Sequence, residues 1–206
     1  MAAPTLTPFP LSCIAALTIL ALLSSLTIPC CAASDADPSS SPYLEFVKAS
    51  CAYTTYPDVC YETLSSYAAT IQTSPTELAK EALSVSLNSA QLTSDVVTNL
   101  SKMSDLTKRE SGAVNDCMEM ISDSADELRQ SLVAMRDLQG PEFKAQMNNI
   151  QTWVSAALTD DDTCMDGFNA GKGSDKGKVK GIIRSNVMRV AQLTSNALAL
   201  ISRLSE

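Results

Sequence analysis

The chain has 206 residues, with 23 acidic and 15 basic side chains and a formal net charge of −8. It contains no histidine, which excludes Ser-His-Asp and Cys-His catalysis and histidine-based metal sites. Its acidity is a poor match for nucleic acid or an anionic membrane surface, and it suits a positively charged partner or solubility alone. Few aromatic residues and abundant Ala, Leu, Ser and Val favour helix over sheet.

The N-terminal segment has the pattern of a targeting signal. Residues 11–28 are apolar with small polar interruptions, and Cys31-Ala32-Ala33 follows as a small-residue exit. This predicts a secretory signal peptide over residues 1–33, followed by a flexible lead-in at 34–42. A membrane anchor is the competing interpretation, because the run approaches spanning length. The small-residue exit favours cleavage, so we expect a secreted, extracellular protein with no membrane contact afterwards.

The body of the chain begins with a predicted helical hairpin over residues 43–68, with a turn at Tyr56-Pro57. A long helix is predicted to start at Ser74-Pro75-Thr76-Glu77, where Ser74 is a good N-cap and Glu77 completes a capping box. Its apolar stripe is Leu78, Ala82, Val85, Leu92, Val96 and Met103.

Three further helices follow at the same period. The second spans about 108–138, and its seam is Val114, Cys117, Ile121, Ala125, Leu128, Leu132 and Met135. The third runs from about 141 past 158, with Phe143, Met147, Ile150, Trp153, Val154 and Ala157 as its apolar residues. The acidic run 160–162 is expected to be a helix end and turn. The last helix begins near 174, and its seam is Val179, Ile183, Asn186, Val190, Leu193, Ala197, Leu200 and Leu204.

Short connections between four amphipathic helices predict an all-α, up-down-up-down bundle over residues 74–206. With the hairpin, the predicted domain covers 43–206. Asn186 is expected to be buried and to bond across the bundle, and Trp153 to belong to the core.

Four cysteines remain after signal cleavage: Cys51, Cys60, Cys117 and Cys164. In an oxidising compartment they predict two disulfides, with three connectivities open. A zinc site is disfavoured, because there is no C-x2-C pair and no histidine. Asn99-Leu100-Ser101 is a sequon, so Asn99 is a candidate glycosylation site.

Glu119, Asp123 and Asp126 fall at helical spacing on one face of the second long helix, opposite its seam. Periodicity alone favours a solvated acidic face, and a partner that supplies cations is the alternative. Paired-carboxylate catalysis is disfavoured on a convex helix surface. The run from Asp160 lacks the Gly and Glu that an EF-hand loop requires. We therefore expect no metal, no cofactor and no enzymatic activity, and instead a binding or inhibitory module.

The sequence also resembles a known family. Cys51-Ala-Tyr-Thr-Thr-Tyr-Pro-Asp-Val-Cys60 resembles the N-terminal hairpin of the plant invertase/pectin methylesterase inhibitor family. The second bundle helix of that family resembles two segments of this chain, Ala113-Val-Asn-Asp-Cys117 and Asp123-Ser-Ala-Asp126-Glu-Leu128. Trp153-Val-Ser-Ala-Ala-Leu-Thr-Asp-Asp-Asp-Thr-Cys164 is the most specific match, and Ser195-Asn-Ala-Leu-Ala-Leu200 resembles the closing helix. The resemblance covers the whole mature chain, with all four cysteines in order.

The resemblance implies disulfides Cys51–Cys60 and Cys117–Cys164. It implies a monomeric inhibitor in the apoplast, or plant cell wall, that covers an enzyme's substrate cleft reversibly in a one-to-one complex. In members directed at pectin methylesterase, acidic residues of the second bundle helix and a Thr before the fourth cysteine lie at the interface. These positions correspond to Glu119, Asp123, Asp126 and Thr163.

Two other roles remain open within the family. Inhibitors of acid invertase share a Pro-Lys-Phe element, whereas this chain has Pro141-Glu142-Phe143, with the charge inverted; pectin methylesterase is therefore the favoured target. The same domain also occurs as a pro-region of pectin methylesterases. The sequence ends at Glu206 directly after the last predicted helix, which favours a free inhibitor.

Overall fold

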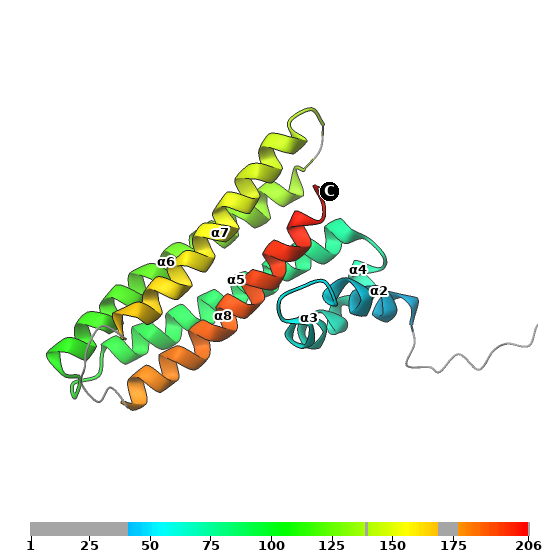
Figure 1. The fold of residues 1–206 in the computed structure, drawn as a ribbon. Coiled ribbons are helices and arrows are strands. Elements are labelled where there is room, and N and C mark those ends of the chain that lie inside the picture. Colours follow the sequence, from blue (N-terminus) through cyan, green and yellow to red (C-terminus); the bar gives the residue numbers. More distant parts are fainter. Residues whose placement is uncertain (1–40, 139, 169–176, 206) are drawn as a thin grey trace, which may run out of the picture. The chain divides into compact units, whose positions relative to one another are not determined.

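The computed structural model describes residues 41–138, 140–168 and 177–205, and these residues form helices without any strand (Figure 1). The predicted signal peptide, residues 1–33, lies outside the described residues, and so does the predicted start of the last helix at 174–176. Among the described helices, none is long and apolar enough to cross a lipid bilayer.

The N-terminal region consists of α2 (Pro42–Cys51), α3 (Pro57–Leu64), the 3-10 turn η1 (Ser65–Tyr67) and α4 (Ala68–Ile71). Both α2 and α3 begin with a proline, at a position where the missing N–H costs no helical hydrogen bond. Ser41 caps α2 by accepting a hydrogen bond from the Tyr43 N–H at 3.3 Å. After α4, Gln72 takes a positive φ of 54°, which ends the helix.

The bundle consists of α5 (Pro75–Ser101), α6 (Lys108–Arg136), α7 (Phe143–Gly167) and α8 (Lys178–Ser202). The predicted cap of α5 is half correct. Ser74 accepts a hydrogen bond from the Glu77 N–H at 3.2 Å. The Glu77 carboxylate, however, pairs with Lys80 at 2.9 Å instead of returning to Ser74, whose N–H donates to the Ile71 carbonyl.

A complete capping box lies at the start of α6, where it was not predicted. Thr107 Oγ1 accepts from the Glu110 N–H at 3.2 Å, and the Glu110 carboxylate accepts from the Thr107 N–H at 3.0 Å. Two of the orphan donors at this helix start are thereby satisfied.

The acidic run 160–162 is not a turn, and this prediction was wrong. Helix α7 continues through it to Gly167 and carries Cys164 in its last turns. Asp161 occupies a core-facing position one turn after Ala157, and both residues are fully buried. The helix continues because no Gly or Pro interrupts the chain before Gly167.

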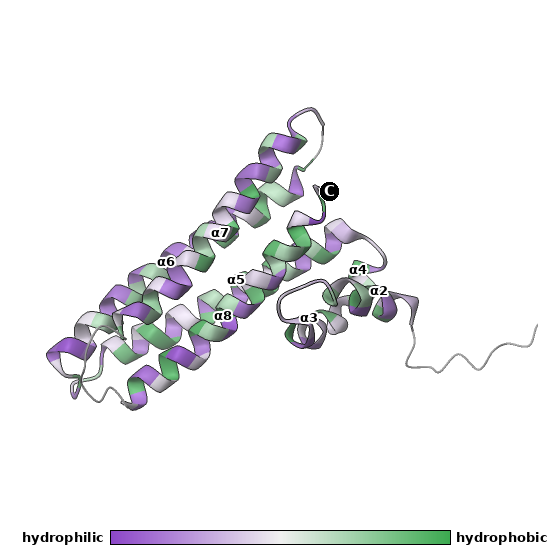
Figure 2. Cartoon of the chain, in the orientation of Figure 1, coloured by the Kyte–Doolittle hydropathy of each residue, from purple (hydrophilic) through white to green (hydrophobic). Residues whose placement is uncertain are grey.

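The four long helices pack as an antiparallel bundle, which confirms the predicted all-α fold. Figure 1 shows α6 beside α7 and α5 beside α8, and these two pairs share the most extensive packing. Figure 2 shows hydrophobic and hydrophilic residues alternating along each long helix, as expected for helices with one buried face. The predicted seam of α6 is buried except for the half-buried Leu132.

The seams of the other helices differ from the prediction at several residues, and Met103 and Phe143 are among those that are exposed. Leu92 of α5 is 58% exposed, and the core positions of that helix are instead taken by Ser86, Ala90 and Thr93. Their small side chains allow close approach of the neighbouring helices. Asn186 of α8 is half-buried and donates to the Ile182 carbonyl of its own helix at 2.8 Å, so it does not bond across the bundle.

Trp153 is likewise only half-buried. It lines a shallow, largely apolar groove between α6 and α7 together with Arg129, Gln130, Val133 and Ala134. The structure therefore places the single Trp at the surface edge of the α6–α7 contact and not in the core.

Candidate partner-binding face

Helix α6 presents the three predicted acidic residues to solvent. Glu119, Asp123 and Asp126 are exposed and follow each other at steps of four and three residues, while the seam of the helix faces inward. We call these three residues the acidic face. Asp126 already has a cation, because its carboxylate pairs with Arg129 one turn later. Glu119 and Asp123 are therefore the members with the more available charge.

Thr163 lies on α7 and is also exposed. Its hydroxyl donates to the Thr159 carbonyl of its own helix at 2.8 Å, which leaves the oxygen's acceptor lone pairs directed away from the helix backbone. The next residue, Cys164, forms a disulfide with Cys117 of α6, with 4.2 Å between the two Cα atoms. This bond fixes the turn of α7 that carries Thr163 against the turn of α6 that leads to Glu119.

The acidic face meets α7 through four carboxyl groups, which we call the carboxyl cluster: Asp123, Glu127, Asp160 and Asp161. Asp123 and Asp160 act on each other electrostatically, and Asp160 acts on Glu127 in the same way. Asp160 lies three residues before Thr163, on the same side of α7. The structure thus brings Asp123 and Thr163 to one α6–α7 surface through Asp160.

Asp161 is the buried member of the carboxyl cluster. It has no exposed surface, and its Oδ1 accepts a hydrogen bond from Ser124 Oγ of α6 at 3.1 Å. Burial raises the pKa of this carboxyl to about 8, with smaller contributions from the neighbouring carboxylates, although the Ser124 hydrogen bond opposes the shift.

Glu127 and Asp160 occupy a half-buried position between the two helices. Burial is the largest cause that raises the pKa of Glu127 to about 7, and Asp160 and Asp123 add to it. Burial also raises the pKa of Asp160 above its ordinary value. Sequence reasoning missed Glu127 and Asp161. Their signals were the four-residue spacing from Asp123 to Glu127 and the helical spacing of Ala157, Asp161 and Cys164.

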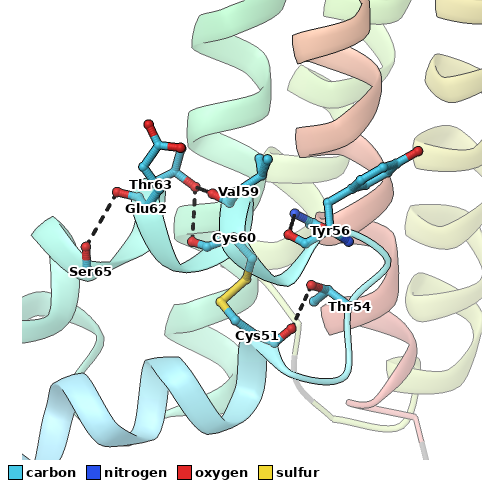
Figure 3. The surroundings of a disulfide bond; sticks show 9 residues. Cys51, Thr54, Tyr56, Val59, Cys60, Glu62, Thr63 and Ser65 are labelled. Atoms are coloured by element: carbon cyan, nitrogen blue, oxygen red, sulfur yellow. Dashed lines mark hydrogen bonds between the residues drawn. A yellow bond between two sulfur atoms is a disulfide. The ribbon is translucent and has the colours of Figure 1, made fainter.

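The second disulfide, Cys51–Cys60, closes the N-terminal hairpin (Figure 3). Thr54 donates to the Cys51 carbonyl at 2.8 Å within the turn. Asn196 of α8 then fastens the hairpin to the bundle, because it donates to the Tyr56 carbonyl and accepts from the Tyr56 N–H, both at 2.9 Å. The two disulfides have the connectivity that the family resemblance implies.

Asn99 of the sequon is exposed in the last turn of α5, and its glycosylation stays a prediction. In the part of the chain that the structure describes, no group of three or more acidic or cysteine side chains is arranged to hold a metal ion. What the described surface offers is a pair of helices with exposed carboxylates and a hydroxyl, which suits the binding of a protein partner.

Comparisons with known proteins identify the family. Residues 45–200 match the model of the family named plant invertase/pectin methylesterase inhibitor. A 21 kDa protein of Daucus carota is 48% identical over 170 residues, which cover 81% of this chain and 87% of that protein. Pectinesterase inhibitor 11 of Arabidopsis thaliana is 44% identical over 172 residues, which cover 82% of this chain and 84% of that protein.

A crystal structure of a mutant form of a pectin methylesterase inhibitor from Arabidopsis has a similar fold. Its TM-score is 0.59 at 19% identity, over 74% of this chain and 92% of that one. The chain therefore belongs to the plant invertase/pectin methylesterase inhibitor family, and it is an enzyme inhibitor and not an enzyme.

Proposed function

We propose that this protein is secreted to the plant cell wall, where it inhibits pectin methylesterase by binding reversibly, one to one, across the enzyme's pectin-binding cleft. Relatives named pectinesterase inhibitors support this target. The observation that carries the proposal is that α6 exposes the acidic face and α7 exposes Thr163, on two helices that the Cys117–Cys164 disulfide joins directly after Thr163 and shortly before Glu119.

The mode of inhibition would be steric. A rigid pair of helices laid across an open cleft excludes the polymer without changing the enzyme covalently. The acidic face, Glu119, Asp123 and Asp126, would contact basic or hydrogen-donating groups on the enzyme. Thr163 would form a hydrogen bond with the enzyme at the edge of the contact. Such charge pairing makes association sensitive to salt.

The test is a titration of the secreted protein against purified plant pectin methylesterase and, in parallel, acid invertase. The chain is expressed through the secretory pathway of an oxidising host, and mass spectrometry of the product locates the cleavage site. We expect stoichiometric loss of pectin de-esterification, with no effect on invertase. Loss of invertase activity alone would move the function to the other target of the family.

Glu142 bears on the invertase alternative. It stands where invertase-directed members carry a Lys, and it is exposed at the start of α7. If invertase were inhibited, Glu142→Lys should strengthen that inhibition, whereas an inhibitor of pectin methylesterase acting through the α6–α7 surface should be little changed by it.

A further inference from the structure

The α6–α7 contact contains carboxyl groups in a place where an ionised carboxylate is costly. Asp161 is fully buried, and although its Oδ1 accepts from Ser124, its Oδ2 receives no hydrogen bond. A buried charge without a paired cation or a full set of donors is unstable relative to its neutral form. A protonated Asp161 removes the charge and can keep the Ser124 hydrogen bond.

The same holds for the neighbouring pair. The Oε2 atom of Glu127 is buried and receives no hydrogen bond from a donor group, while the Asp160 carboxyl lies close enough to act on Glu127 electrostatically. Two ionised carboxylates are both acceptors and neither can donate to the other, so a proton on one of them relieves this contact. Like charges at this range also raise the cost of ionising both.

No cation relieves this cluster within the described residues. From α6 the facing groups are Asp123, Ser124 and Glu127, and from α7 they are Asp160 and Asp162. The positions of α5 and α8 that face the core carry no titratable side chain. Arg129 of α6 is exposed and pairs with Asp126 on the solvent side.

We propose that the carboxyl cluster is a proton-operated clasp, which keeps α6 and α7 together in acidic surroundings and loosens their contact as the pH rises through neutrality. The clasp is a property of the fold and holds whichever enzyme the protein inhibits. Asp123 belongs both to this cluster and to the acidic face, so the surface offered to a partner would be best ordered in an acidic compartment.

The direction of the effect follows from proton linkage. Burial raises the pKa of Asp161 from 3.8 to about 8 and that of Glu127 from 4.5 to about 7. Below the ordinary values both folded and unfolded chains are protonated, and stability is complete. As the pH rises above the unfolded-state pKa values, the unfolded chain releases its protons before the folded chain does. The free energy of unfolding therefore falls until the pH passes the folded-state pKa values. Between its unfolded-state and folded-state pKa values, each group raises the unfolding equilibrium constant about tenfold per pH unit.

The test compares chemical denaturation of the oxidised, full protein at pH 4.5, 6, 7.5 and 9. The variants are Asp161→Asn and, as a matched control, Asp116→Asn, which removes an exposed carboxylate of α6. We expect the unfolding constant of the parent protein to rise at least a hundredfold from pH 4.5 to 7.5. Asp161→Asn should flatten this slope by about one proton, while Asp116→Asn runs parallel to the parent.

Carbon-13 NMR of the carboxyl groups of the parent protein gives a second measurement that does not depend on a variant folding. A carboxyl that titrates near pH 8 and loses this behaviour in Asp161→Asn supports the clasp. A parent protein whose stability is flat between pH 4.5 and 7.5, or whose aspartate carboxyls all titrate near pH 4, overturns it. Neither measurement involves an enzyme. The proposed inhibition can therefore be disproved without disproving the clasp, and the clasp can be disproved without disproving the inhibition.

Discussion

Asn196 forms two hydrogen bonds with the backbone of Tyr56, 140 residues earlier in the chain. Its Nδ2 donates to the Tyr56 carbonyl and its Oδ1 accepts from the Tyr56 N–H, each at 2.9 Å. This amide therefore pairs with the turn of the hairpin as a neighbouring backbone strand would. Together with the hydrogen bond from Ser195 Oγ to Thr55 Oγ1, it links α8 to the disulfide-closed loop from Cys51 to Cys60.

We predict that Asn196→Ala lowers the free energy of unfolding by about 2 kcal/mol, because the partly buried Tyr56 N–H loses its acceptor and the Tyr56 carbonyl keeps only the hydrogen bond from the Cys60 N–H. Asn186→Ala is the control. That side chain bonds only to a carbonyl of its own helix, so its loss should cost about 0.5 kcal/mol. Equal losses for the two variants in urea denaturation would contradict the anchoring role of Asn196.

These two asparagines also show which features of α8 could be predicted from the sequence and which could not. Asn186 follows the seven-residue spacing of the α8 seam and was expected to be buried. The asparagine of α8 that is buried is Asn196, with 2% exposure. The partner of Asn196 is the backbone of a turn in the hairpin. No periodicity within α8 can reveal that turn, because its position depends on how the hairpin packs on the bundle.

The same distinction separates α6 from α5. The seam of α6 could be predicted because its core positions carry large apolar residues such as Ile121 and Leu128 at helical spacing. In α5 the core passes through Ser86 and Thr93, whose small polar side chains resemble surface residues in a sequence. Leu92 was therefore assigned to the predicted stripe although it is exposed, whereas Leu78 and Ala82 of the same stripe are buried.

Asp161 shows why part of the candidate site could not be predicted from the sequence. Acidic residues are seldom fully buried, so a run of three aspartates is more naturally taken as a turn. Its burial depends on Ser124, 37 residues away on α6, and on a protonation state that the sequence does not display. Helical spacing singled out Glu119, Asp123 and Asp126, and the family resemblance supplied their role in binding and added Thr163. The structure adds that all four are exposed.

The two disulfides should contribute unequally to stability. In a chain-entropy treatment, Cys117–Cys164 closes the longer loop, with a sequence separation of 47, and Cys51–Cys60 the shorter, with a separation of 9. We expect Cys117→Ser with Cys164→Ser to cost about 4 kcal/mol, and the corresponding hairpin pair about 3 kcal/mol. Denaturation of each double variant checks the order, and a larger loss from the hairpin pair would contradict it.

Neutralising the acidic face should weaken the proposed inhibition of pectin methylesterase. Combining Glu119→Gln, Asp123→Asn and Asp126→Asn removes three exposed carboxylates, each worth up to about 1 kcal/mol in an exposed pair. We expect the inhibition constant to rise about tenfold or more, mainly through slower association, and its salt dependence to flatten.

The matched control for that variant removes the same charge elsewhere. Glu45→Gln, Asp58→Asn and Asp95→Asn alter exposed positions on α2, α3 and α5. If this control weakened inhibition as much as the α6 variant, the effect would belong to net charge and the acidic face would lose its assigned role.

Glu127 provides the last prediction, on pH dependence. Burial, Asp160 and Asp123 raise its pKa from 4.5 to about 7, so in the folded protein it holds a proton at pH values where the unfolded chain has released one. Its contribution to stability is complete below about pH 4.5 and is lost as pH rises through about 7. Glu127→Gln removes this titration, and the amide can still donate to Asp160. We expect the variant and the parent to unfold at similar urea concentrations at pH 4, and the variant to be the more stable at pH 8. A variant that is less stable than the parent at pH 8 would show that an ionised Glu127 is satisfied in the fold by contacts other than Asp160.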